Sequence, residues 1–174
     1  MEDMDKTLCQ WFLEEIENES RATRACIERF REDLSDWKPH ERSMKMGQLA
    51  LLLADMPRWI TYAIQQEEID FATFPQMRAV TTEEMLALFD KNMKDAREAL
   101  EGCDDKKLDE DFFLKSGGKE LMKDTKKNTV GMTINHLAHH RGQYTVYLRL
   151  NNIPVPSIYG PSGDDTTWAP DYSS

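Results

Sequence analysis

Several protein classes require features that are scarce in this sequence. No apolar run is long enough to span a membrane, since the most apolar stretch, residues 49–64, is interrupted by two charged residues and a proline. The three cysteines are widely spaced and form no C-x-x-C pair, which argues against a disulfide framework or a zinc knuckle and indicates reduced thiols. Glycine and proline are also few, at 8 and 7 of 174 residues, which favours helices over a turn-rich β architecture.

Positive charge is scarce as well. The chain carries 22 Lys and Arg against 32 Asp and Glu, a net charge of −10, so attraction to phosphate backbones or anionic membranes is unfavourable. We therefore expect neither nucleic acid nor a membrane as a partner. The first residues, MEDMDK, contain no basic segment followed by an apolar run, which predicts that the protein lacks a secretory signal and is cytoplasmic.

Apolar residues at helical spacing predict an all-α fold with four helices. The second helix should be kinked by Pro57, which removes a backbone hydrogen bond, and the third should begin with a capping box formed by Thr81 and Glu84. Between the third and fourth helices, a Gly-Gly pair flanked by short apolar runs predicts a small β-hairpin. The four helices are expected at residues 5–32, 44–66, 81–102 and 129–151. The hairpin is expected at residues 109–122, and an extended C-terminal strap at residues 153–174. Together they predict a four-helix bundle formed by a single domain over residues 1–174.

Three of the four histidines lie in the last predicted helix. His136 and His140 are one helical turn apart and therefore share a face, a spacing at which two imidazoles can hold one divalent metal ion. His139 lies at the neighbouring edge of that face, where it is free for solvent or for a hydrogen bond to a ligand residue. The alternative is a polar helix face that is rich in histidine and binds nothing.

Three other positions carry expectations about packing. Glu19 falls close to the apolar stripe of the first helix, where a solvated edge position is favoured over a buried hydrogen-bond partner. Arg141 could hold a carboxylate on a neighbouring helix or subunit, and a structural salt bridge is favoured over a catalytic role. Gly142 costs about 1 kcal/mol relative to Ala in mid-helix, which predicts the close approach of another helix.

A longer pattern surrounds the histidines. The run TINHLAHHRGQ at residues 133–143, continued by residues 147–150 and by VPSIYGPS at residues 155–162, resembles the DinB/YfiT-like family. The similarity reaches back to residues 36–40 and 46–50 and covers most of the chain. The resemblance implies a four-helix bundle, frequently a homodimer, with a zinc or nickel ion held by three histidines. Two of these histidines match His136 and His140.

The sequence departs from the family pattern at the third ligand. The resemblance places that histidine in the second helix, at the position of Leu52, and no other histidine lies in this helix. His40 precedes the helix and is expected to fix a turn by hydrogen bonding. Asp55 could swing inward at the kink and give a set of two histidines and one carboxylate, and Gln48 is a weaker substitute. Because Leu52 fills the ligand position with hydrocarbon, we expect the metal site to be empty or loosely occupied.

Two functions follow from this reading. The resemblance implies a metal-dependent enzyme, either a hydrolase or a transferase that adds a small-molecule thiol to an electrophile. In that case His136 and His140 would be the ligands and His139, Arg141 and Gln143 would support them, with no residue assigned a catalytic role. The alternative is a metal-free dimeric bundle that binds a small molecule or a protein without catalysis. Leu52 weighs against the tight metal binding that the enzyme requires.

Overall fold

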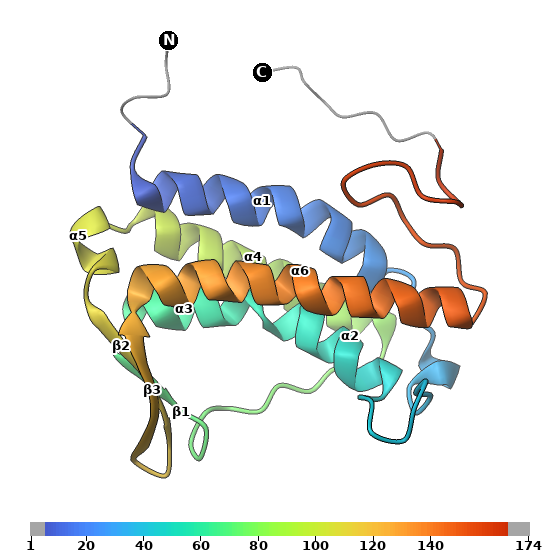
Figure 1. Ribbon diagram of the computed structural model, residues 1–174, viewed down its shortest axis with the longest axis horizontal. Coiled ribbons are helices and arrows are strands. Elements are labelled where there is room, and N and C mark those ends of the chain that lie inside the picture. Colours follow the sequence, from blue (N-terminus) through green and yellow to red (C-terminus); the bar gives the residue numbers. More distant parts are fainter. Residues whose placement is uncertain (1–5, 167–174) are drawn as a thin grey trace.

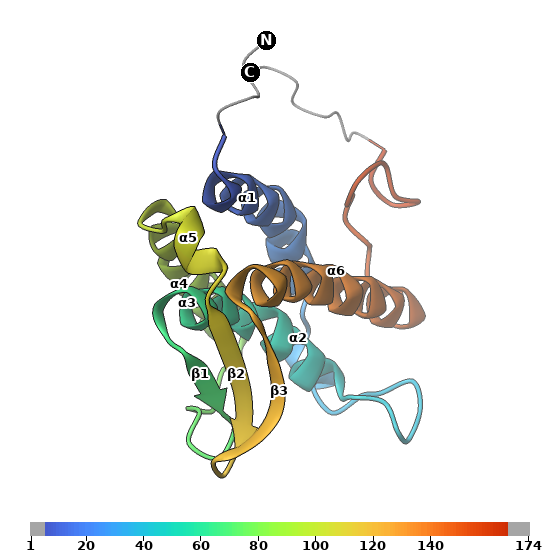
Figure 2. The same ribbon diagram turned by 60° about the vertical axis from the view of Figure 1, so that its left-hand side comes forward.

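The computed structural model describes residues 6–166, and within them the chain is mostly helical with one small three-stranded sheet. Figure 1 shows the long helices lying side by side, and Figure 2 shows the sheet at the end of the helical layer where the last helix begins. The elements in chain order are α1 (Leu8–Ile27), η1 (Glu32–Leu34), α2 (Met46–Asp55), α3 (Pro57–Gln65), β1 (Glu68–Asp70), α4 (Thr82–Glu101), α5 (Asp105–Leu108), β2 (Asp111–Ser116), β3 (Lys119–Thr125) and α6 (Lys126–Leu150).

Capping residues determine where most of the long helices begin. Thr81 accepts a hydrogen bond from the Glu84 N–H, and the Glu84 carboxylate accepts one from the Thr81 N–H, which confirms the predicted capping box. Gly102 ends the same helix, as expected. Thr125 caps α6, so this helix begins at Lys126, three residues before the predicted start. The first helix is shorter than the predicted range, because α1 ends at Ile27 and only the short turn η1 follows.

Pro57 divides the second predicted helix in two. It has no N–H to donate, and the chain continues as α3 after α2 ends at Asp55, with Met56 between them in a helical conformation. The two short helices run end to end beside α6 (Figure 1), and both pack against α4 as well. The helix begins at Met46 rather than Met44, because residues 40–43 form a turn closed by the bond from the Ser43 N–H to the His40 carbonyl.

The sheet has the order β1-β2-β3. β2 and β3 pair antiparallel across Gly117 and Gly118, whose φ values of 60° and 78° need a residue without a Cβ. This is the region of the predicted hairpin. β1 was not predicted, and it pairs parallel with β2. The carboxylate of Asp70, at the end of β1, accepts hydrogen bonds from both glycine N–H groups and so attaches the turn to the first strand.

The core lies between the helices. α4 and α6 each pack against α1, α2 and α3, and the side chains between them exclude water. Fully buried apolar residues come from every long helix and from β2: Cys26, Ile27, Met46, Leu49, Leu53, Ile60, Phe89, Phe112, Tyr144 and Leu148. Gly47 allows the start of α2 to approach Ser35, because a Cβ at position 47 would meet the Ser35 Oγ at 2.2 Å.

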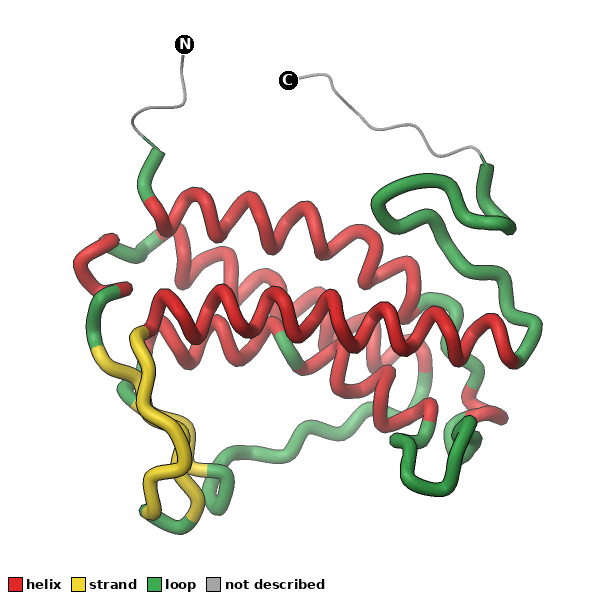
Figure 3. Tube along the Cα trace, in the orientation of Figure 1, coloured by secondary structure: helices red, strands yellow, loops and turns green. Residues whose placement is uncertain are grey.

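The segment after α6 has no helix or strand up to residue 166. It turns back from the end of α6 toward α1, as Figure 3 shows, and its Tyr159 reaches Glu19 of α1. The rest of the predicted strap, residues 167–174, lies outside the described residues. In the described part of the chain, the helices are all too short or too polar to cross a membrane.

Candidate functional site

His136 and His140 face each other on α6. Their Nε2 atoms lie 2.8 Å apart and their ring centroids 4.4 Å apart. His140 is buried, with 7% of its surface exposed, whereas His136 and His139 are exposed. The spacing of one helical turn therefore does bring the two predicted ligands together, and their nitrogens point toward a common point.

Hydrogen bonds define the protonation of the pair. The Gln143 Oε1 lies 2.8 Å from the Nδ1 of His140, and an amide oxygen can only accept, so this contact favours the tautomer of His140 that carries its proton on Nδ1. In the neutral ring this leaves a lone pair on the Nε2 of His140, which accepts a hydrogen bond from the Nε2–H of His136. Gln143 thus orients His140. Both nitrogens of His140 thus have partners within α6.

The environment disfavours the charged form of His136. Burial, followed by the proximity of His140 and His139, lowers the pKa of His136 below its usual value of 6.5. The ring of His139 lies 5.1 Å from that of His140, centroid to centroid, at a steep angle. The three rings form one aromatic cluster on the exposed side of α6.

The donor set can be compared with what a metal ion requires. Two imidazole nitrogens bound to a tetrahedral zinc at their usual distances lie about 3.3 Å apart, so this pair would have to open by roughly 0.5 Å. That adjustment is small. A third protein ligand is what the site lacks: within residues 6–166, no three His, Cys, Asp or Glu side chains form a group that could hold a metal ion. A catalytic metal centre with three protein ligands does not fit these residues.

The candidates for the third ligand have other roles. Leu52 lies in α2, partly buried against the apolar core. Asp55 binds Arg58 through Oδ2 at 2.7 Å, and Arg58 also donates to the Pro75 carbonyl, so this carboxylate is held toward the loop before α4. Gln48 accepts a hydrogen bond from the Lys45 N–H at the start of α2. His40 accepts from the Arg42 N–H, the turn-fixing role expected of it.

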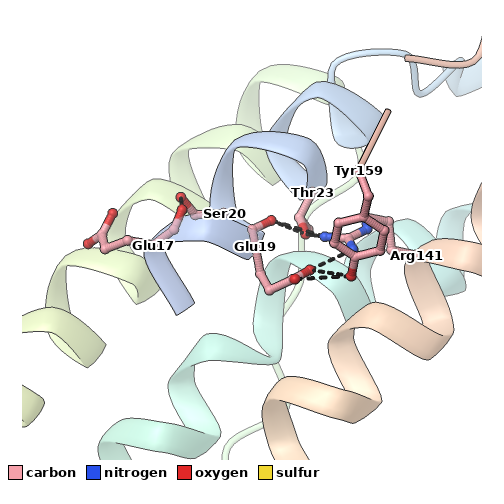
Figure 4. A network of polar contacts seen from close by, with 6 residues as sticks. All are labelled: Glu17, Glu19, Ser20, Thr23, Arg141 and Tyr159. Atoms are coloured by element: carbon pink, nitrogen blue, oxygen red, sulfur yellow. Dashed lines mark hydrogen bonds and ion pairs between the residues drawn. The ribbon is translucent and has the colours of Figure 1, made fainter. Parts of the chain in front are cut away.

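Arg141 has the structural role that the sequence favoured. Its guanidinium binds the Glu19 carboxylate at 2.5 Å and also donates to the Glu19 carbonyl, the Thr23 hydroxyl and the Tyr159 hydroxyl. Figure 4 shows these groups converging between α1, α6 and the segment after α6. Glu19 is only 5% exposed, so the expectation of a solvated edge position was wrong, because the arginine compensates the buried charge.

Two features of the neighbourhood were not predictable from local pattern. Tyr159 lies in a segment without helical or strand periodicity, so its hydrogen bond to Glu19 could not be predicted from the pattern. The one available signal was an aromatic residue within the run that resembles the family. Gly142 has no heavy atom within 4 Å of the place a Cβ would occupy, so the expected close approach of another helix was wrong. Its position is solvent-exposed.

A hollow lies beside the histidine pair. It has a volume of about 410 Å³ and is lined by Arg42, Ser43, Met44, Gln143, Val146 and Tyr147. Gln143 belongs both to this hollow and to the hydrogen bond that orients His140. A ligand in the hollow would therefore contact the residue that controls the histidine pair. A second hollow, of about 550 Å³ between α1 and α6, is lined by none of the predicted site residues.

Known proteins share this architecture. The model of the DinB family matches residues 3–171. The chain belongs to the DinB family. No curated protein sequence matches this DinB-family chain. Among solved structures it is similar to a DinB-like protein from Bacillus subtilis, with 19% identity, a TM-score of 0.68, and coverage of 85% of this chain and 97% of the other. It is also similar to a DinB-like protein from Bacillus cereus, with 20% identity, a TM-score of 0.65, and coverage of 85% and 95%. At these identities the likeness establishes the fold.

Proposed function

We propose that this DinB-family protein is a small-molecule-binding four-helix bundle in which the metal centre of the family has degenerated. The α2–α3 pair would count as one kinked helix of the bundle and β2–β3 as its hairpin. The chain would act as a cytoplasmic homodimer. Its His136–His140 pair would hold zinc or nickel only weakly, and its ligand would be a small-molecule thiol or electrophile bound in the hollow beside Gln143.

The contact between the two Nε2 atoms is the observation that carries this proposal. At 2.8 Å the rings are hydrogen-bonded to each other, and Gln143 satisfies the remaining nitrogen of His140. A metal ion would have to break the bond between the rings and displace the proton it holds. With hydrocarbon at position 52 and Asp55 bound to Arg58, residues 6–166 supply no third ligand in return.

The hollow supports the second part of the proposal. Its lining combines a guanidinium, an amide and a hydroxyl with the apolar surface of Met44 and Val146, and its size suits a small organic molecule. Tyr147 donates its hydroxyl proton to the Met44 carbonyl at 3.1 Å, which fixes one wall. The hollow is therefore partly organised before a ligand arrives.

A metal-dependent transferase or hydrolase is the second candidate. The two Nε2 atoms would have to move apart by only roughly 0.5 Å to bind zinc, which favours a metal-dependent enzyme over a bundle that never binds metal. In that case His136 and His140 would hold the ion and Gln143 would orient His140, while a third ligand would have to come from solvent or substrate. Metal affinity separates the two candidates.

Titration calorimetry with zinc and with nickel at neutral pH is the first test. The wild-type chain should bind weakly, and Leu52→His should tighten binding roughly tenfold or more by supplying a third imidazole. Leu51→His is the matched control, because Leu51 is also partly buried in α2 but lies one residue off that face, and it should leave the affinity unchanged. One tightly held metal per wild-type chain would overturn the degenerate site, and no gain in Leu52→His would refute the alignment of α2.

Ligand binding is tested separately. A panel of small-molecule thiols and electrophiles should raise the melting temperature of the metal-free protein, and Val146→Trp should abolish the shift by filling the hollow. Met132→Trp fills the other hollow and should keep the shift. Thiol transfer that appears only when zinc or nickel is added to the wild-type chain would favour the enzyme instead. Sedimentation equilibrium tests the homodimer.

A further inference from the structure

Two of the three cysteines meet at one end of the molecule. Cys9 lies in the first turn of α1, and Cys103 follows the C-terminal end of α4. The Cys9 thiol lies close enough to the Cys103 thiol and to the carboxylate of Asp105 for both groups to raise its pKa. The same carboxylate accepts the backbone N–H groups of Leu8 and Cys9 at 2.8 and 2.9 Å, so the start of α1 is fastened to the segment that carries Cys103.

The two thiols differ in accessibility. Cys9 is 1% exposed, whereas Cys103 is only half-buried and its Sγ lies 3.5 Å from the Asp104 carbonyl. Burial, together with the neighbouring Cys103 and Asp105, raises the pKa of the Cys9 thiol far above its usual range. Because Cys9 is buried and Cys103 is partly exposed, Cys103 is the thiol that a reagent in solution can reach first.

We propose that Cys9 and Cys103 form a reversible disulfide when the folded protein meets a small disulfide such as oxidised glutathione. Cys103 Sγ attacks the small disulfide, forms a mixed disulfide and releases one small thiol. Cys9 Sγ then attacks Cys103 Sγ, and the second small thiol leaves. The two protein thiols are oxidised, the small disulfide is reduced to two thiols, and the two thiol protons leave with them.

The third cysteine is a built-in control. Cys26 lies fully buried in the core, and burial raises its pKa to about 11. It should neither react nor exchange with the pair. A bond between Cys9 and Cys103, which are 94 positions apart in the chain, would join the start of α1 to the end of α4. Closing a loop of that length restricts the unfolded chain and stabilises the folded one.

The experiment uses the full chain and oxidised glutathione as the probe. After exposure, free thiols are alkylated under native and then denaturing conditions, and non-reduced peptides are analysed by mass spectrometry. The expected products are a Cys9–Cys103 linked peptide, one remaining thiol at Cys26, and a melting temperature raised by roughly 5–10 °C that dithiothreitol reverses.

Variants separate the two steps. Cys9→Ala should stop the reaction at a stable glutathione adduct on Cys103, and Cys103→Ala should leave Cys9 unmodified. Cys26→Ala should form the linked peptide as the wild type does. A stable adduct on wild-type Cys103, a link that involves Cys26, or two unreacted thiols in the wild-type chain would each overturn the proposal, and the wild-type measurement decides even if a variant does not fold.

Discussion

At the residue scale, Arg141 is a buried charge that depends on one carboxylate. Its side chain is 2% exposed and that of Glu19 is 7% exposed, so water does little to screen either group. Breaking a buried pair by removing one partner leaves the other charge uncompensated, which costs far more than losing an ion pair at the surface. Removing either partner of this pair should therefore destabilise the protein more than removing one partner of a surface ion pair.

We predict that Glu19→Gln lowers the free energy of unfolding by about 3 kcal/mol, measured by urea denaturation. Glu98→Gln is the control, because Glu98 is 60% exposed in its pair with Lys94, and it should cost less than about 1 kcal/mol. The double variant Glu19→Leu with Arg141→Met should recover part of the loss, since no buried charge is then left alone. Equal effects of Glu19→Gln and Glu98→Gln would contradict the argument.

Two helical glycines should respond oppositely to the same substitution. Gly47→Ala should destabilise the protein by about 1–3 kcal/mol, because the added Cβ would collide with Ser35. Gly142→Ala should stabilise it by up to about 1 kcal/mol, since nothing lies within 4 Å and alanine favours the helix. Thermal unfolding should show a lower melting temperature for Gly47→Ala and a higher one for Gly142→Ala. A loss of stability in Gly142→Ala would show that something packs against that position.

At the element scale, the helices with local signals could be predicted and the elements that depend on distant partners could not. Thr81, Glu84 and Gly102 lie at the two ends of α4, and both ends were predicted from them. β1 has three residues and exists because it pairs with β2, more than forty residues later, so no local pattern indicates it.

The start of α6 shows the same limit. Lys126 would be expected at the surface, but it is 2% exposed, and its Nζ donates to the carbonyls of Ile64 and Gln66 at the C-terminal end of α3. A lysine that satisfies the carbonyls of another helix has no signature in the sequence around it. The histidine pair is the opposite case, since the separation of four residues within one helix was enough to bring the rings together.

Asp70 connects stability of the sheet to pH. Hydrogen bonds from the backbone N–H of Ala72, then from Gly118 and Gly117, lower the pKa of its carboxyl below 3.8. The pKa of this carboxyl is lower in the folded protein than in the unfolded chain. The charged carboxylate therefore stabilises the fold fully above the unfolded-state pKa, and this contribution is lost as the pH falls through the folded-state pKa.

Asp70→Asn should therefore lower the melting temperature at neutral pH, and the difference from the wild type should shrink at about pH 3. Circular dichroism at both pH values measures it. A difference that does not change with pH would mean that the carboxylate charge does not strengthen the contacts with the two glycine N–H groups.

At the scale of the whole molecule, the hydroxyl of Tyr159 connects the segment after α6 to both α1 and α6. The ring of Tyr159 is mostly exposed, at 68%, but its hydroxyl accepts from Arg141 at 2.6 Å and donates to Glu19 at 3.0 Å. Within the segment, Ser162 is hydrogen-bonded to Val155, Asp164 and Asp165, and Ile153, Val155 and Ile158 pack against the core. Arg149 adds one ion pair to Asp164 at 2.6 Å, more than half exposed on the arginine side.

Tyr159→Phe should consequently loosen this segment from α1 and α6 with a loss of about 1–2 kcal/mol, because hydrogen bonds to charged groups are stronger than average. Limited proteolysis should cut residues 153–166 faster in the variant, and urea denaturation should show the loss. Tyr144→Phe is the matched control, since the Tyr144 hydroxyl is buried without a hydrogen-bond partner and its removal should leave stability equal or higher. If both variants behave alike, the hydroxyl of Tyr159 does not attach the segment, and its position depends on apolar contacts such as those of Ile153.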